Sequence, residues 1–215
     1  TDFGDLTVAR GHCDGLSNGS RGVFGGGGDG GAASNVIEYI TIASTGNATD
    51  FGDLTVARQE PGAASDGSRG VWAGGRSGGT FYDVMDYITI ASTGNATDFG
   101  NLSGTRGSMA GTSNGSRGVF AGGSTADSSS GATNVISYIT IASTGNATDF
   151  GDLTVARQAL GGTSDGSRGV FGGGYHSGGT TVNVIDYITI SSTGNATDFG
   201  DLTTSRLGVG ATSGT

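Results

Sequence analysis

Hydrophobic residues along this chain come in short clusters separated by polar and glycine-rich stretches. The clearest cluster is Val36–Ile42, in which residues 37, 39 and 41 would point to one side of a strand and residues 36, 40 and 42 to the other. Both sides are mostly apolar, which predicts a strand covered on both faces. No segment has the period of an amphipathic helix, so we expect almost no helix.

The clusters belong to a repeat. The segment TDFGDLTVAR begins at Thr1, Thr49 and Thr148, and variants of it begin at Thr97 and Thr197. The phenylalanines of these segments are spaced by 48, 48, 51 and 49 residues. Only one loop of each repeat changes in length (28–34, 76–82, 124–133 and 175–182), and the remaining 41 residues are constant in number. This is the pattern of a rigid scaffold that presents variable loops.

Each repeat predicts four strands, which we name a to d. In the first repeat they are Gly11–Ser17, Arg21–Gly27, Val36–Ile42 and Thr49–Val56. The small-residue strand a recurs at 59–65, 107–113, 158–164 and 207–213. Asn-Gly or Asp-Gly follows strand a in the four full repeats and favours a type I′ hairpin turn, which needs positive φ at both residues.

Four-stranded units of this length, apolar on both faces, predict the blades of a β-propeller, with strand a innermost. We expect an all-β fold in which 1–215 is one domain, with full blades at 11–58, 59–106, 107–157 and 158–206. Residues 1–10 would form a lone outer strand and 207–215 a lone inner strand. This predicts an incomplete ring of five or more blades, closed by further residues or by a neighbouring chain.

The repeat resembles the kelch family of β-propellers, to which galactose oxidase belongs. The resemblance rests on four features in order: a Gly pair after an aromatic residue (VFGGG, VWAGG, VFAGG), a Tyr, a further aromatic residue and an Arg. The residues in these roles are Tyr39, Phe51, Arg58, Tyr87, Phe99, Arg106, Tyr138, Phe150, Arg157, Tyr187, Phe199 and Arg206. Kelch repeats usually carry Trp where Phe51 stands, and the interval from Tyr to this aromatic residue is longer here. The text YITIASTGNATDFGDLTVAR is also similar to kelch-like repeats in structural proteins of marine tailed bacteriophages, which implies a virion or extracellular location.

Composition excludes several classes of protein. Glycine accounts for 46 of 215 residues without a triplet period, which excludes collagen. The net charge of −9 opposes nucleic-acid binding, and no apolar run approaches the ~20 residues of a membrane span, so we expect neither nucleic acid nor membrane insertion. A single cysteine, Cys13, excludes an internal disulfide.

Catalysis is not expected. The copper site of galactose oxidase needs two His, two Tyr and a crosslinked Cys. This chain has a single Cys, Cys13, and only two His, of which His12 lies in the first strand a and His176 several blades away in the fourth b–c loop. A copper oxidase is therefore a remote alternative, and we predict no cofactor and no metal. The repeated Asp50 and Asp53 are interpreted as turn formers, with bound calcium left open. The arginines that recur in register are interpreted as bonds between blades.

Binding is therefore assigned to the variable loops. The b–c and d–a loops should share one face of the propeller, and bulky or charged residues gather there. The candidate binding residues are Glu60, Arg76, Phe81, Tyr82, Asp127, Tyr175 and His176. We expect a phage virion or tail fibre module that contacts other virion proteins or a host-surface glycan or protein, with a homo-oligomer possible. The alternative is a secreted or surface-attached bacterial adhesin or lectin-like propeller.

Overall fold

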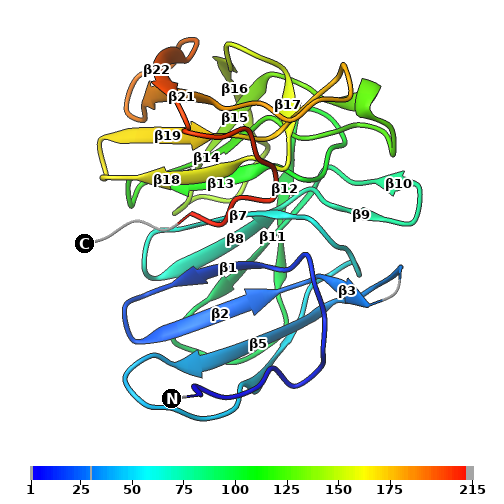
Figure 1. Cartoon of the computed structure of the whole chain (residues 1–215). Coiled ribbons are helices and arrows are strands. Elements are labelled where there is room, and N and C mark those ends of the chain that lie inside the picture. The colour runs from blue at the N-terminus through cyan, green and yellow to red at the C-terminus, as the bar shows by residue number, and fades with distance from the viewer. Residues whose placement is uncertain (1, 30, 212–215) are drawn as a thin grey trace.

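The structure, a computed structural model, describes residues 2–29 and 31–211, and its regular secondary structure consists almost wholly of β-strands (Figure 1). Across these residues the sole helical element is a 3-10 turn, η1 (Ser129–Gly131). The expectation of an all-β chain with almost no helix is confirmed. No helix in the described ranges is long and apolar enough to span a membrane.

Four antiparallel four-stranded sheets share the strand order a–b–c–d, which is consistent with a β-propeller. The first sheet contains β1 (Asp14–Ser17), β2 (Arg21–Gly25), β5 (Val36–Thr41) and β6 (Thr49–Asp53). The second contains β7 (Gly62–Ser65), β8 (Arg69–Ala73), β11 (Val84–Thr89) and β12 (Thr97–Asn101). The third contains β13 (Ala110–Ser113), β14 (Arg117–Ala121), β15 (Val135–Thr140) and β16 (Thr148–Asp152). The fourth contains β18 (Gly161–Ser164), β19 (Arg168–Gly172), β21 (Val184–Thr189) and β22 (Thr197–Asp201).

The a strands of consecutive sheets lie side by side, as the positions of β1, β7, β13 and β18 in Figure 1 show. Small residues permit this close approach. A Cβ atom added to Gly111 on β13 would come within 2.0 Å of the Ala63 carbonyl oxygen on β7. Serine hydroxyls also join these strands: Ser65 Oγ donates to Ser17 O at 3.2 Å, and Ser113 Oγ donates to Ser65 O at 2.6 Å.

Strand a is shorter than the sequence predicts, because the residue two places before it has a left-handed backbone. The φ angles of His12, Glu60, Ser108 and Ala159 lie between 53° and 59°. Such a residue cannot continue a strand. Its backbone N–H instead donates to the equivalent carbonyl of the preceding sheet, as from Glu60 to His12 and from Ser108 to Glu60.

The a–b turn is not the predicted type I′ turn. In the first repeat only Gly19 has positive φ, at 82°, and Asn18 does not. The Asn18 side chain accepts hydrogen bonds from the backbone N–H groups of Ser20 and Arg21 at 3.0 and 2.8 Å. The Asn18 side-chain oxygen thus stabilises a longer turn in place of the type I′ turn. The prediction from the Asn-Gly dipeptide does not take these side-chain hydrogen bonds into account.

The two ends of the chain differ from expectation. No strand forms over residues 2–10, although Phe3 O and Asp5 O accept hydrogen bonds from the following sheet as β6 does. This segment has no c strand beside it with which to form a ladder. Residues 207–211 likewise form no strand for lack of a b strand, and residues 1 and 212–215 lie outside the described part.

The hydrophobic core lies between consecutive sheets. Phe51 and Leu54 of the first sheet share one buried cluster with Trp72, Ile88 and Ile90 of the second. In each sheet the repeated Tyr packs edge-on against the repeated Phe, with ring centroids 5.9 to 6.0 Å apart. An arginine of strand b stacks on the same Tyr at 4.3 to 4.8 Å.

Buried arginines tie each sheet to the next. Arg58, which follows β6, lies 2.8 Å from Asp86 on β11, and Arg157 lies 2.8 Å from Asp186 on β21. At the third sheet the acidic residue is replaced, and Arg106 donates to Ser137 Oγ at 2.7 Å. A second set of arginines joins neighbouring sheets through carbonyl groups, as in the 3.0 Å hydrogen bond from Arg21 Nη1 to Ile90 O.

The outer faces of the first and fourth sheets are covered less completely, although Arg10 forms a buried ion pair with Glu38 on the first sheet. Phe199 is 56% exposed, whereas its equivalents Phe51, Phe99 and Phe150 are each 2% exposed. Ile42 is 43% exposed, whereas its equivalent Ile90 is fully buried. Arg206 is exposed and has no acidic partner in the described structure. Both end faces therefore present the residues that elsewhere form sheet–sheet contacts.

Candidate functional site

The variable loops are held to the scaffold by a short backbone bridge. In the second repeat, Gln59 of the d–a connection and Arg76 of the b–c loop exchange two hydrogen bonds of 2.8 and 2.9 Å. In the fourth repeat the same bridge is a pair of short strands, β17 (Arg157–Gln158) and β20 (Tyr175–His176). The b–c and d–a segments therefore share one end of the sheets, which we call the loop face.

A hairpin presents two of the candidate residues together. Strands β9 (Arg76–Ser77) and β10 (Thr80–Phe81) pair so that Phe81 lies directly opposite Arg76. Gly78, with φ of 55°, allows the tight reversal between them. The first repeat has a similar hairpin of β3 (Gly28–Asp29) and β4 (Ala32–Ala33), without aromatic or basic residues.

Arg76 is the centre of an ionic network that joins two sheets. Its Nε and Nη2 atoms donate to the two carboxylate oxygens of Glu60 at 3.0 and 2.9 Å, and its Nη1 donates to Asp127 Oδ1 at 2.8 Å. Ser108 Oγ donates to the same Glu60 carboxylate. Asp127 belongs to the longest variable loop, in the third repeat, so the network fixes that loop against the second sheet.

These contacts set the charge state of Glu60. Burial alone would raise the pKa of the Glu60 carboxyl, but hydrogen bonds from Arg76 and Ser108 and the positive charge of Arg76 outweigh it, so the pKa is lowered. The hydrogen bond to Glu60 raises the pKa of Arg76 further. Glu60 is thus a firmly ionised, weak base. It is poorly suited to activate the Ser108 hydroxyl for nucleophilic attack.

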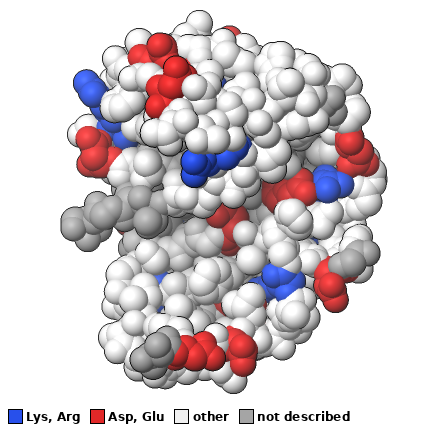
Figure 2. Space-filling model, in the orientation of Figure 1, with Lys and Arg blue, Asp and Glu red and all other residues white. Residues whose placement is uncertain are grey.

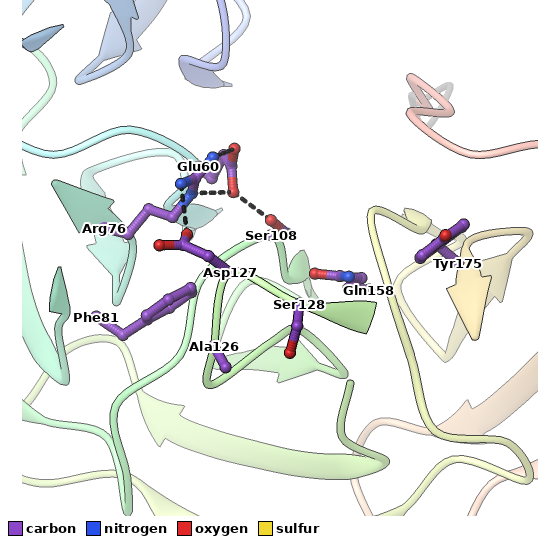
Figure 3. A pocket seen from close by; sticks show the side chains of 9 residues that line it. All are labelled: Glu60, Arg76, Phe81, Ser108, Ala126, Asp127, Ser128, Gln158 and Tyr175. Atoms are coloured by element: carbon purple, nitrogen blue, oxygen red, sulfur yellow. Dashed lines mark hydrogen bonds and ion pairs between the residues drawn. The ribbon is translucent and has the colours of Figure 1, made fainter. Parts of the chain in front are cut away.

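A pocket of about 490 Å³ opens beside this network (Figure 3). It is lined by Glu60, Arg76, Phe81, Ser108, Ala126, Asp127, Ser128, Gln158 and Tyr175. Five of the seven candidate residues predicted from the sequence are among them. Loops of the second, third and fourth repeats all contribute. We call this cavity the loop-face pocket.

Tyr82 and His176 do not line this pocket. Each is the neighbour in sequence of a residue that does, and successive residues of an extended chain point to opposite sides. His176 Nδ1 accepts a hydrogen bond of 2.9 Å from the Gly178 N–H and so closes its own loop. Tyr82 is partly buried, and its backbone carbonyl accepts a hydrogen bond from the Arg106 N–H.

Sequence reasoning missed Ser108 and Gln158, because neither is bulky or charged. A signal was present in the repeat register. The position of Ser108 carries His12, Glu60 and Ala159 in other repeats, so it varies in chemistry while the strand around it stays small. Variation in residue type at constant length marks the loop face as clearly as variation in length.

A second cavity, of about 580 Å³, lies where the a strands meet. His12, Cys13 and Asp14 of the first repeat line it, together with Glu60 and Ser108, which also line the loop-face pocket, and small or apolar residues of the other repeats. Burial raises the pKa of the Cys13 thiol, which leaves it a poor nucleophile. Burial also raises the pKa of Asp14 to about 6, despite hydrogen bonds from the N–H groups of Gly15 and Ala63.

Asp50 and Asp53 do not form a turn as predicted, because both lie in strand β6, whereas the repeated Asn side chains accept hydrogen bonds from the backbone. Asn95 in the c–d turn accepts a hydrogen bond of 3.1 Å from the backbone N–H of Asp53 in the preceding sheet, and Asn47 accepts one from Asp5 in the same way. Within residues 2–29 and 31–211, no group of three or more His, Cys, Asp or Glu side chains could hold a metal ion.

Charged side chains on the face shown in Figure 2 form small separate groups within a largely uncharged surface. The loop-face pocket combines one such ionic group with two aromatic rings and several hydroxyl and amide groups. Such a cavity can bind a small polar ligand or a protruding group of a larger partner. No protein-family model matches the chain, and no curated protein was found to be similar to it.

Proposed function

We propose that this chain is a non-catalytic binding module in which a repeated scaffold carries a loop-face recognition site. The observation that carries the proposal is the convergence of Glu60, Arg76, Phe81, Asp127 and Tyr175 on one pocket. These residues come from three repeats and occupy the segments that vary most. The weak basicity of Glu60 argues against acid–base chemistry at the same place.

We further propose that the four sheets are consecutive blades of a kelch-like β-propeller. The common topology, the adjacent a strands and the cores between sheets support this arrangement. The uncovered Phe199 and Ile42 faces have the composition of blade interfaces, which supports additional blade strands of the same kind beside them. Small-angle scattering of the longest natural chain would test the arrangement, since a closed ring gives a flat disc and an open stack gives a rod.

The biological setting that we propose is a phage virion, as a tail fibre or tail-associated module that touches the host surface or another virion protein. The support is the resemblance of the repeat sequence to kelch-like repeats in phage structural proteins. Antibodies raised against this chain should label tailed phage particles from seawater in immunoelectron microscopy. Labelling of bacterial cell surfaces in the absence of particles would instead favour the adhesin.

The binding role is tested with variants matched by position. The fluorescently labelled chain would be incubated with a panel of intact marine bacterial cells, and binding measured by flow cytometry. Tyr175→Ser should lower binding at least tenfold, because an aromatic anchor of the pocket is lost. His176→Ser, one residue away on the other side of the strand, should bind as the parent does. Equal binding by both variants to every cell that the parent binds would contradict the proposal.

A further inference from the structure

The ligand class of the loop-face pocket follows from which of its groups remain free to bind. This inference rests on the proposed binding function and adds the chemistry of the ligand. Figure 3 shows Phe81 and Tyr175 toward opposite sides of the view, with the Arg76 network and Gln158 between them. The charges, the hydrogen-bonding groups and the aromatic rings of the pocket each restrict the chemical class of ligand that it can bind.

The charges exclude an acidic ligand. Arg76 is the sole cationic side chain of the lining, and each of its three side-chain nitrogen atoms already donates to Glu60 or Asp127. Two carboxylates against one guanidinium leave the pocket with a formal charge of −1. A sulfate, phosphate or uronic acid group would meet net repulsion there, in a chain whose net charge is −9.

The free hydrogen-bonding groups favour a ligand that both donates and accepts. In the described structure no hydrogen bond engages the Gln158 amide or the Tyr175 hydroxyl, and Asp127 uses only Oδ1. The amide and the hydroxyl can each donate and accept, whereas the remaining Asp127 oxygen accepts. Alcohol groups match this mixed set, because they also donate and accept. An ammonium or guanidinium group only donates, so it would leave the N–H and O–H donors of Gln158 and Tyr175 without an acceptor.

The two aromatic residues supply the apolar part of the site. Phe81 and Tyr175 are partly buried and line the pocket with ring surface. A pyranose ring has the complementary form, because its C–H groups make an apolar patch while its hydroxyls stay at the rim. The pocket volume of about 490 Å³ lies within the range of small-molecule sites.

We propose that the loop-face pocket binds a neutral saccharide, with its hydroxyls on Gln158, Tyr175 and Asp127 and its apolar faces against the aromatic rings. The Arg76 network then acts as a positioning group. It holds the Asp127 loop in place and neutralises one of the two carboxylates.

The test is titration of the purified chain with immobilised neutral oligosaccharides of glucose, galactose, mannose and N-acetylglucosamine, and with sulfated and uronic acid oligosaccharides. At least one neutral sugar should bind, and no acidic sugar should bind more tightly. Affinity should change less than twofold between 50 and 500 mM salt, because no ion pair forms with the ligand.

Matched variants sharpen the result. Gln158→Ala and Tyr175→Ala should each weaken saccharide binding at least tenfold, whereas His176→Ala should not change it. Asp127→Asn removes one negative charge beside Arg76, and should relax the discrimination against acidic sugars severalfold. Circular dichroism of each variant would establish that it is folded.

Three outcomes would overturn the saccharide proposal: no neutral sugar binds, acidic sugars bind best with a steep salt dependence, or His176→Ala weakens binding as much as Tyr175→Ala. Cell binding that needs Tyr175 but survives periodate oxidation of surface glycans would indicate a protein partner. That result would overturn the saccharide and leave the binding module intact. Cell binding that is indifferent to Tyr175 would instead overturn the module itself.

Discussion

The contact between the first and second sheets and the contact between the second and third are built from nearly the same sequence, but a buried arginine has a different side-chain partner in each. At the first contact Arg58 lies 2.8 Å from Asp86, and both side chains are fully buried. At the second, the equivalent Arg106 meets the hydroxyl of Ser137 instead of a carboxylate.

The two arginines share one backbone partner, because Arg58 donates to Trp72 O at 3.2 Å and Arg106 donates to the equivalent Phe120 O at 3.5 Å. Arg106 donates to Val135 O at 2.7 Å, as Arg10 at the start of the chain donates to Val36 O at 2.7 Å. Burial lowers the pKa of Arg106 to about 10, which still leaves it charged at neutral pH. The difference teaches that a buried guanidinium can be held at this contact in two ways: Arg58 by a carboxylate, and Arg106 by a hydroxyl and additional carbonyl groups.

The largest expected effect comes from removing the arginine at each contact. Arg58→Met should lower the free energy of unfolding by about 3–5 kcal/mol, because it leaves the buried Asp86 carboxylate without its partner. Arg106→Met leaves only a hydroxyl and carbonyl groups without their hydrogen-bond donor, and should lower the free energy of unfolding by about 1–3 kcal/mol. Methionine keeps the packing of the stem in both variants. Denaturant unfolding at pH 7 measures the difference, and equal losses would show that the carboxylate adds no penalty of its own.

The second effect concerns another carboxylate that only the first contact has. Asp14 Oδ2 accepts a hydrogen bond from the Ala63 N–H, and glycine or alanine stands at its position in the other repeats. Its pKa is raised by burial from 3.8 to about 6. Between these two values the Asp14 carboxyl is protonated in the folded chain and ionised in the unfolded chain. The free energy of unfolding therefore falls as pH rises through this window, and the full loss is reached above pH 6.

Asp14→Asn should therefore flatten the stability profile between pH 4 and 6 and stabilise the protein at pH 7 by about 1–2 kcal/mol. Unfolding in denaturant over pH 3.5 to 7.5 measures this. Asp50→Asn, an exposed carboxylate on β6, is the control and should leave the profile unchanged. A parent profile already flat through the window would contradict the assignment.

The strands and their order were predictable because the repeat places the same turns and apolar clusters at constant intervals. The position of the sheet contacts could also be anticipated, since both faces of Val36–Ile42 are apolar. The partner of each arginine could not, because Asp86 follows Arg58 by 28 residues and belongs to the next sheet. Only the packing of one sheet against another brings the two side chains together.

The loop-face pocket was predictable in part. Bulky and charged residues in variable loops identified Arg76, Phe81 and Tyr175, but strand alternation separates Phe81 from Tyr82 and Tyr175 from His176. Short strands within the loops, such as β9 and β20, create that alternation. Their pairing depends on the bridge to the d–a connection, which no local pattern in the loop reveals.

A smaller effect is expected from restoring the carboxylate at the second contact. Ser137→Asp would place an acidic group beside Arg106, as Asp186 stands beside Arg157. Because Arg106 is already desolvated, we expect a gain of about 1 kcal/mol in the free energy of unfolding. Ser143→Asp, in an exposed turn of the same sheet, is the control and should have little effect. A loss of stability in Ser137→Asp would mean that desolvation of the new carboxylate outweighs its attraction to the guanidinium.

The smallest effect concerns the serine hydroxyls that join neighbouring a strands. Ser113 Oγ donates to Ser65 O at 2.6 Å across the second contact, whereas Ser65 Oγ donates to Ser17 O at 3.2 Å across the first. Ser113→Ala should cost about 0.5–1 kcal/mol, and Ser65→Ala less, because the longer hydrogen bond is weaker and more exposed. Ser164→Ala, which removes a 2.7 Å bond to Ser113 O at the third contact, should match Ser113→Ala. Urea unfolding of the three variants gives the order, and the largest loss for Ser65→Ala would show that the first contact, with its additional carboxylates, depends on these hydroxyls more than the second does.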